Sequence, residues 1–427
     1  MHFLLSAFFS DRSGNFGIMT ALLMVPLVGS AGLALDYAHA LSLRTQLYAA
    51  ADAAAVGAVS EKSDAVAAAM TMQGDGTISI AKTDARNIFF SQMSGELAAT
   101  PVELAIDVTK TANKINSQVV FSATVPTTFM HVLGQDSITV SGMATAEYQT
   151  ASFMDFYILL DNTPSMGVAA TPADVSKLEA KTGCAFACHQ MDQSSNNYTI
   201  AKSLGVAMRI DVVRKATQAL TDTAKTERVS ADQFRMGVYT FGTKAEDAKL
   251  TTISSLTSDL TKVKNYTDAV DLMTIPYQNY NKDQLTSFDS AMSQMNTIIT
   301  PAGDGTSNIS PEKILFFVSD GVGDSYKPST CTKKTTGGRC QEPIDTSFCK
   351  PLKDRGVKIA VLYTTYLPLP SNSWYNDWIK PFQNEIPSRM AACASPGLYF
   401  EVSPTEGIAE AMKALFLKVI RAPRLTG

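Results

Sequence analysis

The chain has 427 residues, of which 45% are hydrophobic and 18% charged, so it can build a core and is longer than one average domain. This composition excludes an intrinsically disordered chain. A formal net charge of -4 leaves no basic footprint of the kind that nucleic-acid-binding proteins carry, so that class of function is also excluded.

The first predicted element is an apolar transmembrane helix. Residues 16–35 (FGIMTALLMVPLVGSAGLAL) contain no charged side chain, and twenty helical residues can cross a bilayer core of about 30 Å. A cleaved signal peptide is the alternative, because residues 38–40 (AHA) have small-x-small spacing. Signal peptides usually have an apolar region of ~7–15 residues after several basic ones, whereas only Arg12 precedes this segment. We therefore expect a retained anchor with Pro26 in its middle.

The helix is expected to continue beyond the membrane. Residues 36–59 are rich in alanine, and apolar residues recur there at steps of three and four, which marks one face of a helix. That face comprises Ala40, Leu43, Leu47, Ala50 and Ala54. Its small side chains favour packing against a neighbouring element over exposure to water.

A period of two replaces the helical pattern after residue 101. Apolar residues alternate with polar ones over 102–108 and 119–125, and a third run starts at 138. Turn residues near 113–114 and 134–136 separate the runs, which predicts antiparallel strands with one buried face. We therefore expect an anchor and extended helix over residues 1–60 and a small α+β module over 61–150.

The N-terminal fifty residues carry an ordered set of features. Gly14-Asn15 leads into the apolar helix, Asp36-Tyr37 ends it, and an alanine-rich run follows at 50–55. This order resembles the N-terminal segment of TadE/TadG-like proteins of the Flp (tight adherence) pilus system. The resemblance implies an inner-membrane anchor with most of the chain in the periplasm. Pilin-like members have a glutamate five residues after the cleavage-site glycine, where this chain has Met19, so the uncleaved TadG-like kind is expected.

Six cysteines all lie far beyond the apolar segment. They are Cys184, Cys188, Cys331, Cys340, Cys349 and Cys393. An even number of cysteines in polar stretches indicates disulfides and an oxidising compartment, with fifteen possible pairings. Cys184 and Cys188 precede a histidine as in a haem-attachment motif, but three residues separate them where that motif has two. A local or cross-loop disulfide is preferred for these two cysteines, with free or metal-binding thiols and haem as alternatives.

The second half alternates short apolar runs with amphipathic stretches. Runs at 156–160, 236–241, 314–318 and 357–363 suit buried strands, while 210–220 and 408–419 have helical spacing. Apolar strands alternating with helices predict a mostly parallel sheet covered on both faces, the doubly wound α/β class, over residues 151–427. Ligands of such sheets bind beyond the carboxyl ends of the strands.

Two aspartates directly follow predicted strands of this sheet. Asp161 begins the stretch DNTPS, which also contains Thr163 and Ser165, and Asp320 begins DGVGD. With Thr286 from LTSFD, these residues resemble the metal-ion-dependent adhesion site (MIDAS) of von Willebrand factor A domains, in which an Asp-x-Ser-x-Ser loop, a threonine and a third-loop aspartate share one ion.

Hydroxyl and carboxylate oxygens suit Mg²⁺, Mn²⁺ or Ca²⁺. Few carboxylates leave such an ion avid for one more anion, typically an acidic side chain of a partner. The alternative is that Asp161 only caps a turn whose hydroxyls bond backbone groups.

Two long inserts, near 166–202 and 321–350, leave the same edge of the predicted sheet. Both carry cysteines, and the second is polar with several basic residues. Loops at this rim usually carry recognition, and a disulfide-held surface loop without such a role is the alternative.

The sequence therefore predicts a binding protein of the inner membrane and periplasm. His189 is the only histidine after residue 150, so no Ser-His-Asp or Cys-His catalytic arrangement has support. Pilus or secretion-apparatus proteins are the expected partners, and association of the chain with itself and reach toward the cell surface stay open. An envelope-anchoring or surface-attachment protein unrelated to pili is the second hypothesis, and a haem-bearing redox protein is the third.

Overall fold

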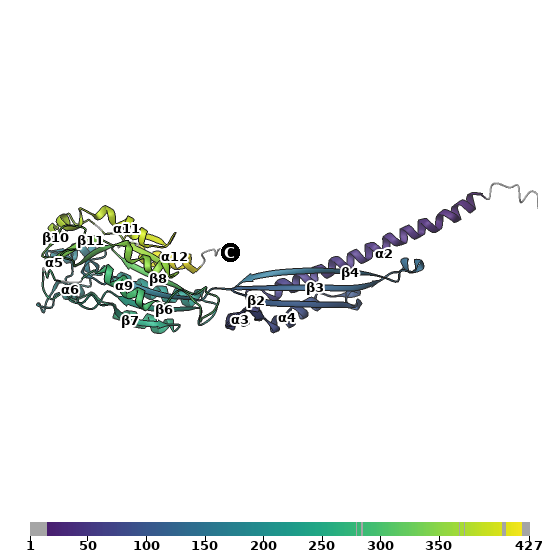
Figure 1. Cartoon of the computed structure of the whole chain (residues 1–427), viewed down its shortest axis with the longest axis horizontal. Helices are drawn as coiled ribbons and strands as arrows, with labels where there is room; N and C mark the ends of the chain where they lie inside the picture. Colours follow the sequence, from purple (N-terminus) through teal and green to yellow (C-terminus); the bar gives the residue numbers. More distant parts are fainter. Residues whose placement is uncertain are drawn as a thin grey trace, which may run out of the picture. The chain divides into compact units, whose positions relative to one another are not determined.

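A computed structural model describes residues 15–278, 280–282, 285–366, 368–370, 372–403 and 407–420. The chain forms two compact units that divide between Thr150 and Ala151 (Figure 1). Arg12 and Gly14, which contribute to the N-terminal sequence pattern, lie outside the described residues.

In the first unit, helices pack on one face of an antiparallel sheet with strand order β1-β2-β3-β4. Its elements are α2 (Asn15–Ala58), α3 (Asp64–Thr71), β1 (Gly76–Thr77), α4 (Ser79–Ser91), η1 (Gly95–Ala99), β2 (Val102–Thr111), β3 (Lys114–Pro126), η2 (Met130–Leu133) and β4 (Ser137–Gln149). The three long strands cover the three runs of period two in the sequence.

The second half of α2 packs on the sheet through small side chains. All five residues of the helical face read from the sequence are buried, so that face is confirmed. The sheet makes room for the helix at Gly142, where an added Cβ would lie 2.6 Å from the ring of Phe121. The rings of Tyr48 and Phe121 meet there edge to face, with centroids 5.2 Å apart.

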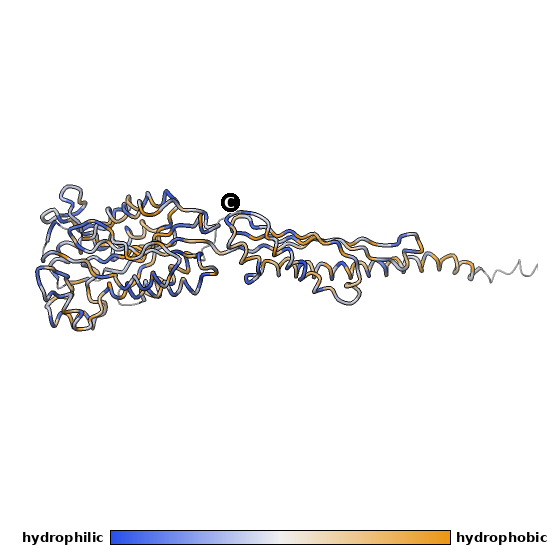
Figure 2. Tube along the Cα trace, turned by 90° about the horizontal axis from the view of Figure 1, so that it is seen from below, coloured by the Kyte–Doolittle hydropathy of each residue, from blue (hydrophilic) through white to orange (hydrophobic). Residues whose placement is uncertain are grey.

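The first half of α2 has an exposed apolar surface. Its large apolar side chains from Ile18 to Leu35 are 46–76% exposed, and Figure 2 shows this stretch as predominantly hydrophobic. Within the described part of the chain, α2 is the one helix long and apolar enough to cross a membrane. The exposure argues against a buried core helix, which would satisfy the same composition.

The second unit contains a six-stranded sheet in the order β13-β12-β8-β5-β6-β7. All its neighbouring strands are parallel except β6 and β7. The strands are β5 (Met154–Leu160), β6 (Phe234–Thr240), β7 (Thr251–Thr257), β8 (Glu312–Ser319), β12 (Lys358–Thr364) and β13 (Tyr399–Val402). The helices are α5 (Pro172–Thr182), α6 (Asn197–Ser203), α7 (Arg209–Glu227), α8 (Leu260–Tyr266), α9 (Phe288–Ile298), α10 (Lys350–Asp354), α11 (Ile386–Cys393) and α12 (Ile408–Ile420), with shorter turns at Pro164–Gly167, Thr267–Ala269, Thr346–Phe348, Tyr375–Ile379 and Gln383–Glu385.

The sheet separates two hydrophobic cores. In β5, Phe156 and Ile158 face the core built with α7, α8 and α12, while Tyr157 and Leu159 face the core built with α9, α10 and α11. Every residue of β5 is buried, as expected for a strand covered on both sides. The predicted doubly wound, mostly parallel sheet covered on both faces is thereby confirmed.

The polar insert after Asp320 forms a small antiparallel sheet of its own. It comprises β9 (Val322–Tyr326), β10 (Thr335–Thr336) and β11 (Arg339–Pro343), in the order β10-β11-β9. One disulfide, Cys331–Cys340, lies within this insert, and a second, Cys349–Cys393, joins the start of α10 to the end of α11.

The first insert departs from the prediction. Cys184 and Cys188 are free thiols, so the disulfide expected there is absent. Phe186, between them, pairs with Val168 in an isolated antiparallel bridge.

Candidate metal centre

Asp161 and Asp320 lie at one edge of the second unit's sheet. They directly follow β5 and β8, which are adjacent parallel strands paired at Leu160 and Val318. The backbone of Asp161 continues this pairing, because its N–H donates to the carbonyl of Val318 at 2.9 Å. Both aspartate side chains are fully buried, so two acidic groups share an environment shielded from bulk solvent.

The hydroxyls spaced along the loop after β5 turn toward this edge. Thr163 donates to Asp161 Oδ1 through its backbone N–H at 3.0 Å and its hydroxyl at 2.6 Å. The Thr163 and Ser165 hydroxyl oxygens are 3.3 Å apart. The other Asp161 oxygen, Oδ2, accepts from Ser319 at 2.5 Å. The loop after β5 therefore forms the hydrogen-bonded turn expected from its sequence. The same contacts bring together four oxygen-bearing side chains, those of Asp161, Thr163, Ser165 and Ser319.

Asp320 is less well satisfied than Asp161. Its Oδ1 accepts from the Val322 N–H at 3.3 Å, and the nearby Ser165 hydroxyl opposes the rise in the pKa of its carboxyl group. Among the described residues, Oδ2 has no hydrogen-bond partner although it is buried. Burial and the charge of Asp161 together raise the pKa of Asp320 to about 7. Burial likewise raises the pKa of Asp161.

Thr286 reaches the site from a separate loop. Its backbone pairs with that of Asp324 in the second insert, with N–H to carbonyl distances of 2.6 and 3.1 Å. The residue is buried and lines the same cavity as Ser165. The structure therefore brings four of the predicted residues into direct proximity, and Thr286 to the wall of the shared cavity.

A buried cation, Arg209, adjoins the two aspartates. It is the first residue of α7 and is 1% exposed, with Nη1 3.6 Å from the unpartnered Oδ2 of Asp320. No guanidinium nitrogen of Arg209 has a hydrogen-bond partner among the described residues. The guanidinium carbon also lies 5.6 Å from the ring centroid of Tyr366. The positive charge of Arg209 compensates one of the two carboxylates when both are ionised, and the second carboxylate then has no counter-charge beside it.

These observations fit a divalent cation. A buried carboxylate oxygen without a partner, a second carboxylate beside it and nearby hydroxyls form a hard-oxygen donor set. Two buried aspartates that are both ionised beside a single guanidinium would leave an uncompensated negative charge, which is costly away from bulk solvent.

A cavity of about 190 Å³ opens beside the donor set. Its walls come from the sheet edge, from both inserts and from the segment after β12. They include Ser165, Thr286, Phe186, Arg339, Tyr366 and Trp374. The Arg339 guanidinium bonds both oxygens of Asp324 at 2.8 and 2.6 Å and lies 4.6 Å from the Trp374 ring centroid, which fixes one wall.

Three residues at this edge were not predicted from the sequence. Arg209 is forty-four residues beyond Ser165, and no spacing rule links the two. Ser319 precedes Asp320 and could be read only as the end of a strand. Asn162 donates to the carbonyls of Gly242 and Asp271 at 2.7 and 3.0 Å, so it ties the loop after β5 to two others.

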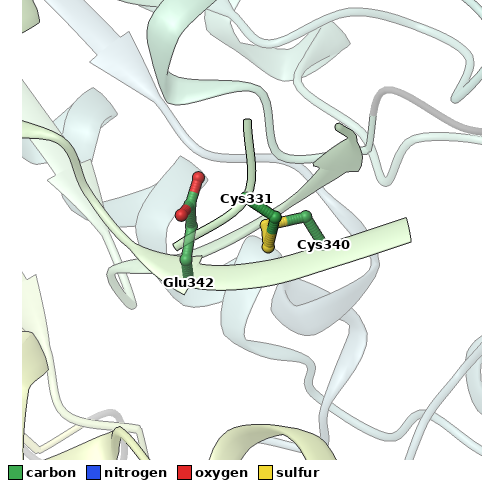
Figure 3. A group of neighbouring side chains, drawn as sticks. All are labelled: Cys331, Cys340 and Glu342. Carbon is green, nitrogen blue, oxygen red and sulfur yellow. A yellow bond between two sulfur atoms is a disulfide. The ribbon is translucent and has the colours of Figure 1, made fainter. Parts of the chain in front are cut away.

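A second cluster of possible ligands has another explanation. Cys331, Cys340 and Glu342 lie together in the second insert, as Figure 3 shows, but the two cysteines form a disulfide. Glu342 accepts from Lys327 at 2.7 Å and from the Thr332 hydroxyl at 2.7 Å. The cluster therefore holds the insert together and is not a metal centre.

Comparison with protein families identifies the N-terminal segment. Residues 14–69 match the model described as putative Flp pilus-assembly TadE/G-like, so the chain carries a TadE/G-like segment at its N-terminal side. A comparison with curated proteins gives no match.

Several solved structures are similar in fold to this chain, at low identity. The von Willebrand factor domain of the type V pili tip protein Mfa5 from Porphyromonas gingivalis is 9% identical, with 65% of this chain and 99% of that one covered and a TM-score of 0.37. The pilus adhesin SpaC from Lactobacillus rhamnosus GG is 10% identical, with coverages of 75% and 34% and a TM-score of 0.37.

Proximal thread matrix protein 1 from the mussel byssus, in a structure with a zinc-occupied MIDAS motif, is 14% identical, with coverages of 62% and 46% and a TM-score of 0.32. This chain thus spans under half the length of the mussel protein.

Proposed function

We propose that this chain is a membrane-anchored component of Flp pilus assembly or adhesion, which binds a partner protein through a divalent cation at the edge of its second unit. The TadE/G-like segment at residues 14–69 supports the pilus role. The function proposed is binding and not catalysis.

The observation that carries the binding site is the buried pair Asp161 and Asp320. One oxygen of Asp320 has no hydrogen-bond partner among the described residues, and Arg209 balances only one of the two charges. A bound cation would supply the missing positive charge. We assign Asp161, Thr163, Ser165, Thr286 and Asp320 as its protein ligands, directly or through water.

Mg²⁺, Mn²⁺ and Ca²⁺ suit this oxygen donor set, and Zn²⁺ belongs in the same test because a structural neighbour holds it at a MIDAS motif. An ion with two carboxylates and neutral hydroxyls retains positive charge and attracts an anion. The adjoining cavity, with its aromatic walls, would admit one acidic side chain of a partner together with its immediate neighbours.

The proposed location is the inner membrane, with the second unit in the periplasm. The exposed apolar half of α2 supplies the anchor. Two disulfides in the second unit suit an oxidising compartment. The units would thus follow the anchor on its periplasmic side.

Calorimetric titration of the full chain in detergent with each of the four ions tests the site. Wild type should bind one ion, and Asp320→Asn and Asp161→Asn should lose binding while keeping the wild-type circular dichroism spectrum. Asp232→Asn, an exposed carboxylate beyond the opposite end of the sheet, is the matched control and should bind as wild type does. Equal affinity in all four proteins would reject the site.

Cells test the pilus role separately. Deletion of the gene should abolish Flp pili, and Asp320→Asn should lose pilus-dependent attachment. Normal pili together with lost attachment in the deletion strain would instead favour a surface-attachment protein that acts without pili.

A further inference from the structure

The tip of the β3–β4 hairpin exposes apolar side chains. Phe129, Val132 and Leu133, in and beside η2, are 43%, 83% and 67% exposed. Four of the six residues from 128 to 133 are apolar, which is unusual for the turn of a solvated hairpin. Contiguous exposed apolar side chains at a loop tip indicate a surface that another phase or molecule covers.

This tip is fixed to α2 by a buried carboxylate. Asp36 accepts from the backbone N–H groups of Thr128, Phe129 and Met130 at 3.0, 2.8 and 2.7 Å. Asp36 is only 7% exposed, so the tip covers it. The exposed apolar residues therefore have a defined position along the helix.

That position lies at the end of the apolar span. Phe129 packs on Gly32, where an added Cβ would lie 2.7 Å from Phe129 Cγ. Gly32 precedes Leu35, the last residue of the uncharged stretch, by three residues, or about 5 Å of helix. A bilayer that covers residues 16–35 of α2 therefore reaches the level of the tip.

We propose that the β3–β4 hairpin tip, residues 128–133, is a second membrane contact, which inserts its apolar side chains into the lipid leaflet beside α2. The proposal rests on α2 as a membrane anchor. Continuity with the lipid-facing side chains of α2 favours lipid over a protein partner, because a protein seated on the tip would compete with lipid for the same level of the helix. His131 and Asp136, which pair at 2.6 Å and are both exposed, suit the headgroup layer.

The insertion can be measured by tryptophan fluorescence of the full chain in phosphatidylcholine vesicles whose acyl chains carry bromine. Val132→Trp reports on the tip and Leu23→Trp on the anchor. Met143→Trp is the matched control, because Met143 is 53% exposed on β4 and lies six residues, about 20 Å, beyond the start of that strand. The signal of the two native tryptophans is subtracted in each case.

Bromine should quench Leu23→Trp and Val132→Trp, and Val132→Trp should respond most to bromine near the headgroup. Met143→Trp should not respond. Quenching of Leu23→Trp without quenching of Val132→Trp overturns the hairpin contact and leaves the anchor standing. Absence of quenching at Leu23→Trp overturns the anchor, and the hairpin proposal with it. If the tryptophan of Val132→Trp is shielded from water to a degree that depends on protein concentration, and bromine does not quench it, a second copy of the chain covers the hairpin tip and the lipid contact is rejected.

Discussion

Replacement of Arg209 by methionine tests the charge balance of the proposed metal centre. Arg209 is a buried cation whose nearest acidic atom is Asp320 Oδ2 at 3.6 Å. Methionine keeps much of the volume of the side chain and removes its charge. Without a divalent ion, Asp161 and Asp320 would then share a buried site with no counter-charge at all.

The expected cost follows from this loss. Removing one partner of a buried ion pair typically destabilises a protein by about 3–5 kcal/mol, because the other charge stays buried and uncompensated. For a unit as long as residues 151–427, each kcal/mol lowers the melting temperature by roughly 2 °C, so we expect a decrease of about 6–10 °C in EDTA. A divalent ion that binds the folded variant, at about 100 times its Kd, would increase the free energy of unfolding by about 2.7 kcal/mol.

Intrinsic fluorescence suits this assay in the full chain, because both tryptophans, Trp374 and Trp378, belong to the second unit. Melting of Arg209→Met is compared in EDTA and in millimolar Mg²⁺ or Mn²⁺. Arg235→Met is the control, since Arg235 pairs with Asp155 at 2.6 and 2.7 Å at the opposite end of the sheet. The decrease in melting temperature caused by Arg235→Met should be the same with and without the divalent ion.

Two results would refute the reasoning. Wild-type melting of Arg209→Met in EDTA would mean that the guanidinium compensates no buried charge. A loss that divalent ions do not reduce, as expected for Arg235→Met, would mean that no ion joins Asp161 and Asp320.

Three further predictions concern topology and the cysteines. A reporter active only in the periplasm should be active when fused to the C-terminus, and activity of a cytoplasm-only reporter there would invert the proposed orientation. The double variant Cys349→Ser with Cys393→Ser opens a 44-residue loop and should destabilise the second unit by about 2–4 kcal/mol in urea unfolding. Mild reduction of this variant should cause no comparable further loss of stability. Partial burial raises the pKa of Cys188 to about 11, so its alkylation in the native protein should stay slow at pH 9 and rise toward pH 11, whereas rapid reaction at pH 8 would contradict the raised pKa.

The sequence predicts the sheet of the second unit well because buried parallel strands need continuous apolar runs. The runs at 156–160 and 314–318 became β5 and β8, and the aspartates that follow them therefore lie at one edge. The three alternating runs of the first unit became antiparallel strands for a similar reason, since one face is buried on α2.

Contacts between distant segments could not be read in the same way. Arg209 reaches Asp320 because α7 begins at this residue, a few positions after the first insert, and the length of an insert does not predict where the next helix starts in space. The second insert forms a sheet although its residues are mostly polar, since disulfide Cys331–Cys340 and ion pairs hold it in place of an apolar face. The contact of Asp36 with three backbone N–H groups likewise depends on a hairpin ninety residues later.

The direction of β4 has a mechanical consequence. The strand begins at the hairpin tip beside the apolar end of α2 and ends at Gln149, next to the boundary with the second unit. In an anchored chain, tension applied to Gln149 along the direction of β4 would load that strand against α2 held in the membrane. The thirteen residue pairs between β3 and β4 would then carry the load together in shear and not open one after another. Under the proposed function, such an edge strand would transmit force from a bound partner to the membrane anchor.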